Sequence, residues 1–123
     1  MEKTITIDGK PITFKATASL GYRYKQQFGV EYLAELQKLQ DFTDSKTQKK
    51  IKTVDGKTVV IDDYDYSKLS LEFLYNLLWA MAKTADPSIP DPVAWLDSFN
   101  VFPVVDIWKQ LQDVVIGNLA SKN

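Results

Sequence analysis

The chain has 123 residues, with 15 basic and 16 acidic side chains and a formal net charge of −1, and this length suits a single domain that can bury a core of its own. Cysteine is absent, which excludes disulfides, thiolate nucleophiles and cysteine zinc sites, and the absence of histidine removes the commonest general base. The opening residues, MEKTITIDGK, have no apolar segment of the kind found in signal peptides, so we expect none there.

The N-terminal residues 4–16 alternate between apolar and polar side chains. The apolar positions are Ile5, Ile7, Ile12 and Phe14. The two halves are joined at Asp8-Gly9, a dipeptide that is typical of tight hairpin turns. The segment therefore predicts a β-hairpin, with Pro11 at a strand start or on an edge.

The next 46 residues predict two helices, a loop and a second hairpin. A helix is expected at 18–28, because bulky residues recur at every turn before Gly29, and a second helix at 30–41. The polar sequence DFTDSKTQKK lacks any periodicity, so residues 41–50 are interpreted as a mobile loop. Apolar residues on both sides of another Asp-Gly pair then predict a hairpin at 51–62.

The C-terminal half predicts three helices, at 67–84, 92–99 and 103–120, separated by prolines. The first is apolar on nearly every side, which is typical of a helix that is surrounded by other elements. Because a small domain has few elements to surround it, we expect part of the apolar surface of this helix to stay uncovered. Its longest apolar run, 69–82, has 14 residues and contains Glu72 and Asn76, against about 20 needed to span a bilayer. A membrane span is therefore not expected. Together these elements predict a mostly helical α+β fold in one domain, 1–123.

Two charged clusters suggest chemistry, but each has a simpler explanation. The carboxylates of Asp62, Asp63 and Asp65 could hold a hard cation, yet the sequence lacks the later glycine and closing glutamate of an EF-hand, and acidic residues before a helix are common. The lysines between Lys46 and Lys57 could contact phosphates, yet the chain has one arginine, Arg23, and no recognisable recognition helix. A solvated surface is the favoured interpretation of both. We expect no enzyme activity, no catalytic or metal site and no cofactor.

Three stretches of the sequence resemble a known family in their order, their length and their pattern of apolar, polar and proline residues. They are ITIDGKPITFKATASLGYRYKQQFG, LEFLYNLLWAMAKTADPSIPD and VAWLDSFNVFPVVDIWKQLQ, which cover most of the chain. In this order they resemble the tail assembly chaperones of long-tailed phages and prophages of Gram-positive bacteria. The segment DFTDSKTQKKIKTVDGKTVVIDD matches nothing in that pattern.

The resemblance implies a non-catalytic role in the cytoplasm of a bacterial host. Such chaperones bind the long helical tape measure protein, keep it soluble, and help tail tube subunits assemble around it, and they leave before the virion is finished. The implied partners are therefore the tape measure and tail tube proteins, with no nucleic acid and no membrane, and an exposed apolar patch would also permit a homo-oligomer. Two alternatives stay open: a nucleic-acid-binding phage regulator that uses the lysine-rich arm, and a structural head–tail connector.

The C-terminal helix is the expected partner surface. Gly117 weakens a helix by about 1 kcal/mol relative to alanine, so its apolar end is suited to exchange between self-contact and partner contact. The residues assigned to this surface are Val114, Ile116, Leu119 and Trp108. Trp108 also lies on the stripe that faces the predicted core. A helical partner would dock there by laying its apolar face into a groove.

Overall fold

The computed structural model describes residues 1–44, 48–63 and 70–119. At 42–44, 48–52, 54, 59–63 and 118–119 only the backbone is described. The chain divides into two compact units, of which unit 1 comprises Met1–Tyr32 and Leu71–Asn123, and unit 2 comprises Leu33–Ser70. The fold is mostly helical α+β, as predicted, with two two-stranded antiparallel sheets and five helices among the described residues.

Unit 1 begins with the predicted N-terminal hairpin. Strands β1 (Glu2–Ile7) and β2 (Lys10–Lys15) pair antiparallel, with Ile5 opposite Ile12 and Thr4 opposite Thr13. The two threonine hydroxyls lie 2.8 Å apart and are hydrogen-bonded on the exposed face. The open end is closed by the first residue, since the backbone N–H of Ala16 donates to the carbonyl of Met1 over 2.8 Å. The alternation seen in the sequence thus separates a face that packs inward from a face in water.

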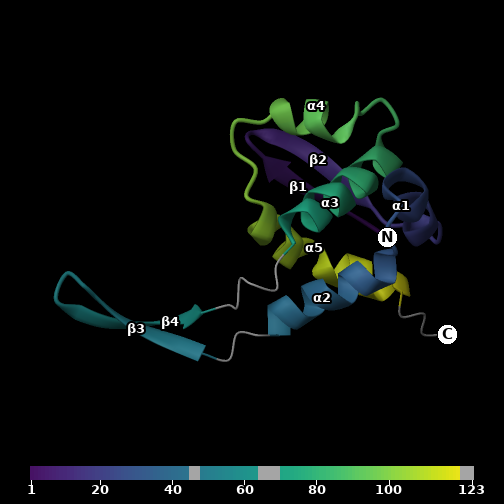
Figure 1. The fold of residues 1–123 in the computed structure, drawn as a ribbon. Helices are drawn as coiled ribbons and strands as arrows, with labels where there is room; N and C mark the ends of the chain where they lie inside the picture. The colour runs from purple at the N-terminus through teal and green to yellow at the C-terminus, as the bar shows by residue number, and fades with distance from the viewer. Residues whose placement is uncertain (45–47, 64–69, 120–123) are drawn as a thin grey trace. The chain divides into compact units, whose positions relative to one another are not determined.

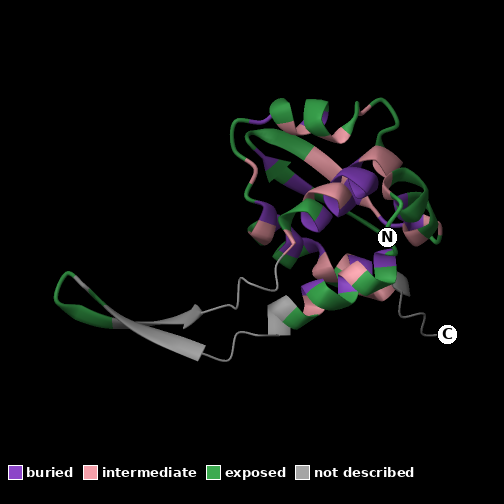
Figure 2. Ribbon diagram, viewed as in Figure 1, coloured by how far each residue is buried: buried purple, intermediate pink, exposed green. Residues whose placement is uncertain are grey.

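Helix α3 (Leu71–Ala85) is the centre of unit 1 and packs against β2, α1, α4 and α5 (Figure 1). Four of its large side chains are fully buried: Leu74, Leu77, Leu78 and Met81. Figure 2 shows that buried residues concentrate on this helix and on the elements beside it. Among its large apolar side chains only Leu71 is exposed, at 46 %. The expectation of surplus apolar surface on this helix is therefore wrong, because four neighbouring elements cover it.

The other helices of unit 1 follow the predicted order. Helix α1 (Leu20–Phe28) ends at Gly29, whose left-handed backbone (φ 73°) lets its N–H donate to the carbonyl of Lys25. Helix α4 (Pro92–Asp97) begins after Asp91, whose carboxylate accepts the N–H of Ala94 over 2.8 Å. Helix α5 (Val104–Leu119) buries a stripe that includes Ile107, Trp108, Leu111 and Val115.

Helix α2 (Tyr32–Asp44) begins at the end of unit 1 and continues into unit 2. It starts two residues later and ends three residues later than predicted. Its buried positions are Tyr32, Leu36 and Leu39, whereas Leu33 is 62 % exposed. The spacing i, i+4, i+7 from Tyr32 defines the true stripe, because the bulkier aromatic ring rather than Leu33 sets the buried face.

The prediction of a mobile loop at 41–50 is wrong at both ends, because the described residues there belong to a helix and a strand. Residues 41–44 complete α2, and residues 48–50 open strand β3 (Gln48–Val54), which pairs antiparallel with β4 (Lys57–Asp63). Residues 45–47 lie outside the described part. The start of this strand was not predicted because its side chains are polar and give no apolar alternation. Its backbone nevertheless pairs with β4, where Lys49 is the register partner of Asp62 and Gln48 of Asp63. The predicted hairpin at 51–62 is thus present and longer.

Helix α3 also begins later than predicted, at Leu71 rather than near residue 67, because Ser70 is not helical. Residues 64–69 lie outside the described part.

Candidate functional site

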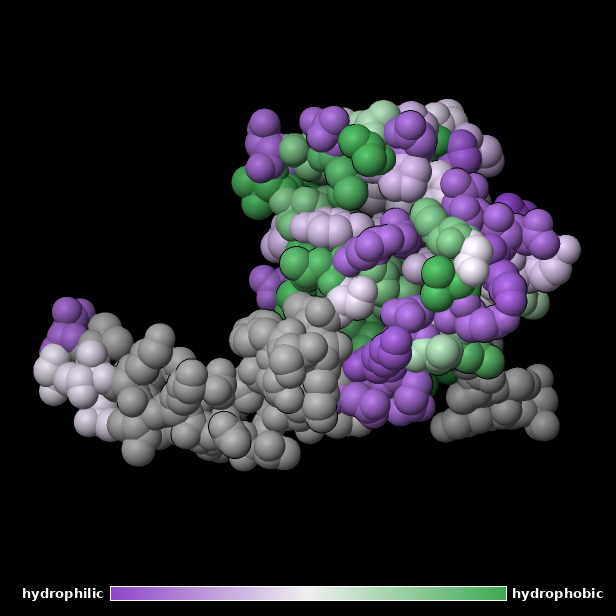
Figure 3. Space-filling view, viewed as in Figure 1, coloured by the Kyte–Doolittle hydropathy of each residue, from purple (hydrophilic) through white to green (hydrophobic). Residues whose placement is uncertain are grey.

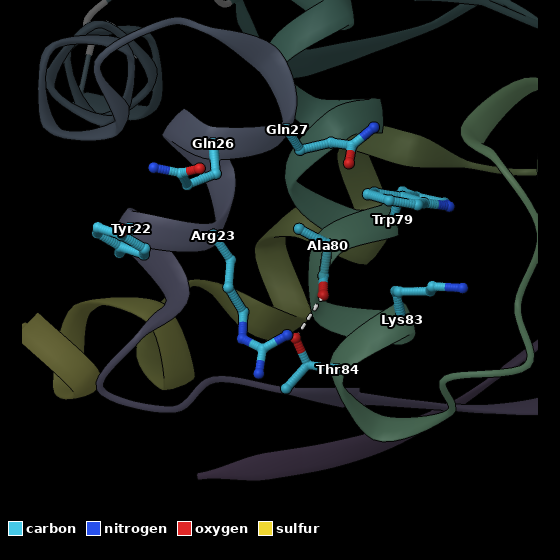
Figure 4. Close-up of a pocket in the computed structure, with 8 residues that line it drawn as sticks. All are labelled: Tyr22, Arg23, Gln26, Gln27, Trp79, Ala80, Lys83 and Thr84. Carbon is cyan, nitrogen blue, oxygen red and sulfur yellow. Dashed lines mark hydrogen bonds between the residues drawn. The ribbon is translucent and has the colours of Figure 1, made fainter.

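A groove lies in unit 1 between α1 and α3, with a volume of about 300 Å³. Helix α1 contributes four residues with the spacing i, i+1, i+4, i+5: Tyr22, Arg23, Gln26 and Gln27. Helix α3 contributes four with the same spacing: Trp79, Ala80, Lys83 and Thr84. That spacing places one face of each helix along the groove. Figure 4 shows Arg23 extending from α1 toward Thr84, whose hydroxyl donates to the carbonyl of Ala80 over 2.7 Å.

The two charged side chains of the groove are both cations. The Nε of Arg23 donates to the hydroxyl of Ser19, one turn earlier, over 3.0 Å. Ser19 precedes α1 but makes no side-chain cap, because its hydroxyl bonds to Arg23 and to Thr17 instead of a backbone N–H. Lys83 donates from Nζ to the carbonyls of Pro87 and Ile89, over 2.7 and 2.5 Å.

The segment after α3 is held against this helix by two of the side chains that line the groove, Trp79 and Lys83. The indole N–H of Trp79, a side chain only 7 % exposed, donates to the carbonyl of Pro90 over 2.8 Å. The carboxylate of Asp86 accepts from both the hydroxyl and the backbone N–H of Ser88, and these bonds, helped by the charge of Lys83, lower the pKa of Asp86. Lys83 and Trp79 therefore fasten this proline-containing segment onto α3.

A second feature is an aromatic cluster where α4 leads into α5. The ring of Phe102 lies 5.5 Å from Trp95, 5.3 Å from Phe99 and 6.0 Å from Tyr75 between centroids. Two apolar side chains beside the cluster in sequence are exposed, Val93 at 69 % and Val101 at 61 %. Figure 3 shows hydrophobic residues gathered over the end of α4 and the segment that leads to α5. The hairpin turn reaches this segment, since Asp8 accepts the N–H of Asn100 over 3.0 Å.

The residues assigned to a partner surface from the sequence divide into two kinds. Val114 and Ile116 are half-buried on α5. Trp108 is 1 % exposed and belongs to the core, so it is removed from the candidate surface. The side chain of Leu119 lies outside the described part. Beside them, a Cβ on Gly117 would lie 2.9 Å from the terminal methyl of Met1, so this glycine lets the start of the chain approach α5 closely.

The two charged clusters singled out in the sequence cannot be placed. The described part of the structure does not include Asp65 and Lys46. It also does not include the side chains of Asp62, Asp63, Lys49, Lys50 and Lys52. Among the residues that are described, no three carboxylates gather in a way that would hold a metal ion. Within the same residues, no helix combines the length and apolar character required to cross a bilayer.

Comparisons with known protein families, with curated proteins and with solved structures find no match to this chain.

The sequence did not indicate the groove between α1 and α3. One signal was present: α1 carries Arg23 and Gln27 at i, i+4 beside an aromatic residue, and the end of α3 carries Lys83 one turn after Trp79. The two faces are more than 50 residues apart in the chain, and the packing of α1 on α3 brings them together. Sequence periodicity identifies each face but not its neighbour.

Proposed function

We propose that the protein is a non-catalytic tail assembly chaperone of a phage or prophage, which binds the tape measure protein and promotes tube assembly. One observation carries the proposal. The three stretches that resemble this family, residues 5–29, 71–91 and 93–112, all lie in unit 1, although 41 residues separate the first two. The segment that matches nothing in the pattern lies in unit 2. The boundary between the two structural units therefore separates the stretches that resemble the family from the segment that does not.

The packing within unit 1 adds support, because the three stretches form one core. Phe14 from the first, Leu78 from the second and Leu111 from the third are each 0 % exposed. A resemblance of order and texture that arose by chance would not require the stretches to fold together. An inserted unit 2 is what a lineage-specific addition to such a protein would produce.

Co-expression tests this function directly. The protein is produced together with a long helical tape measure protein of a long-tailed phage, and the soluble fraction of that partner is measured with and without the protein. We expect the partner to become soluble and to co-purify. An unrelated aggregating helical protein serves as the control for general solubilisation. A partner that stays insoluble and does not co-purify would contradict the proposal.

The C-terminal part of α5 is the proposed contact surface. Changing half-buried Ile116 to Lys places a charge in its apolar portion, and we expect weaker capture of the tape measure protein and less self-association, with the fold retained. Gln110→Lys is the matched control, since it adds the same charge at an exposed polar position of the same helix. Pull-down and light scattering give the two readouts. Equal behaviour of both variants and wild type, with all three folded, would exclude this surface.

A further inference from the structure

The groove between α1 and α3 presents two cationic side chains, of which Lys83 has the carboxylate of Asp86 near enough to lower the pKa of that carboxylate, whereas Arg23 has no acidic partner among the described residues. Among the described residues, no acidic side chain lies within 4 Å of the charged nitrogens of Arg23 or Lys83. The terminal guanidinium nitrogens of Arg23 donate to no other described residue, because its one hydrogen bond uses Nε. A guanidinium with two adjacent free nitrogens is suited to bidentate binding of a carboxylate.

The rest of the groove is suited to an amphipathic segment. The exposed ring of Tyr22 provides most of the apolar contact area, while Trp79 and Ala80, each 7 % exposed, line the floor of the groove, and Gln26 provides an amide that can bond to a peptide backbone. A volume of about 300 Å³ lies at the lower end of ligand sites and suits one or two side chains rather than a large cofactor.

Phosphate is a poorer match for these groups. A nucleic-acid backbone is held by several cations along a strip. Here the ammonium of Lys83 already donates to two backbone carbonyls, which leaves Arg23, among the described residues that line the groove, as the cation whose terminal nitrogens are available to a ligand. One directed guanidinium beside apolar surface matches a single carboxylate on an apolar chain.

We propose that this groove binds an acidic, amphipathic peptide segment of a partner protein. A glutamate or aspartate of the segment pairs with the terminal nitrogens of Arg23, and a neighbouring apolar side chain packs over Ala80 and Trp79. This inference goes beyond the proposed function and does not rest on it, because its test uses synthetic peptides and no phage protein.

The test is an NMR titration of the whole, isotope-labelled protein. The probe is a blocked 16-residue helical peptide with glutamates and leucines on one face, and a matched peptide carries glutamine in place of each glutamate. We expect the glutamate peptide to shift amide resonances at 22–27 and 79–84 and the Trp79 indole resonance, and to bind about tenfold more tightly than the glutamine peptide. Trp79→Phe assigns the indole resonance.

Two charge-reversal variants separate the groove from general attraction. Arg23→Glu should weaken binding by about tenfold, whereas Lys57→Glu, the same charge change at an exposed position of unit 2, should leave it unchanged. Three results would overturn the proposal: no shifts at millimolar peptide, equal binding of the two peptides, or equal loss in the two variants. Tighter binding of inorganic phosphate or a DNA duplex at the same resonances would also overturn it in favour of a phosphate site.

Discussion

The chain builds the same turn twice and uses the two hairpins differently. The sequences TIDGKPITF and TVDGKTVVI each place Asp-Gly at the corner, and both corners have left-handed backbones, φ 52° and 76° at Asp8-Gly9 and 51° and 74° at Asp55-Gly56. The first hairpin lies in unit 1, where β2 packs on α3 and β1 on α5. The second lies in unit 2, where β3 pairs with β4.

The difference shows that turn chemistry forms a hairpin but does not decide what the hairpin supports. Two paired strands alone are marginally stable in water and gain stability by packing on something else. In the first hairpin Phe14 is fully buried and Ile7 is 2 % exposed, so it is part of the core of unit 1. We therefore expect unit 1 to depend on the first hairpin and to be independent of the second.

The largest effect should come from replacing each hairpin by a Gly-Ser segment of equal length. Without residues 2–15, α3 loses the strand that covers it, and we expect unit 1 to unfold, since burial of Phe14 alone is worth about 3–5 kcal/mol. Without residues 48–63, we expect unit 1 to keep its thermal midpoint. Near-ultraviolet circular dichroism measures this selectively, because Trp79, Trp95 and Trp108 all lie in unit 1.

Either of the two hairpin replacements can contradict the expectation that unit 1 depends on the first hairpin and not on the second. If the protein without residues 48–63 also loses its tryptophan signal, the two units fold as one. If the protein without residues 2–15 keeps it, α3 does not need the hairpin.

A smaller effect should distinguish the two turns. Gly9→Ala and Gly56→Ala each force alanine into a left-handed conformation, which costs about 1–2 kcal/mol. Neither position has a neighbouring atom within 4 Å of the new Cβ, so the cost is conformational in both. We expect Gly9→Ala to lower the tryptophan-monitored midpoint by about 5–10 °C and Gly56→Ala to leave it unchanged. Gly9→Asn, which tolerates this conformation better, should recover part of the loss. Equal shifts for Gly9→Ala and Gly56→Ala would refute the comparison.

Apolar periodicity predicted every helix and strand near its observed place, because burial imposes a period on each element separately. It failed where polar residues carry structure: Gln48, Lys49 and Lys50 join a strand through backbone pairing, which leaves no apolar signature. Apolar periodicity also could not predict how much of the surface of α3 is buried, because this depends on the four elements that pack against α3 and not on the sequence of the helix alone. The groove beside Arg23 was missed for the same reason.

The smallest effect concerns Tyr32, the last residue of unit 1 and the first of α2. Its ring packs near Tyr24 and Phe73, with centroids 5.9 and 6.4 Å away, but its buried hydroxyl has no hydrogen-bond partner among the described residues. Removing a buried, unpaired hydroxyl relieves its desolvation cost, so Tyr32→Phe should raise the free energy of unfolding by about 1 kcal/mol in urea titration.

The same burial raises the pKa of Tyr32 above its ordinary value of 10.0. The unfolded chain therefore ionises this tyrosine above about pH 10 while the folded protein keeps it neutral, so its contribution to stability is complete below that pH and is lost as the pH rises further. Tyr32→Phe should consequently lose less stability than wild type between about pH 9 and 11, while Tyr22→Phe, at a ring that is 71 % exposed, should follow wild type. A Tyr32→Phe protein that is less stable at neutral pH would instead show that the hydroxyl is hydrogen-bonded in the folded protein, and would contradict the assignment of an unpaired buried group.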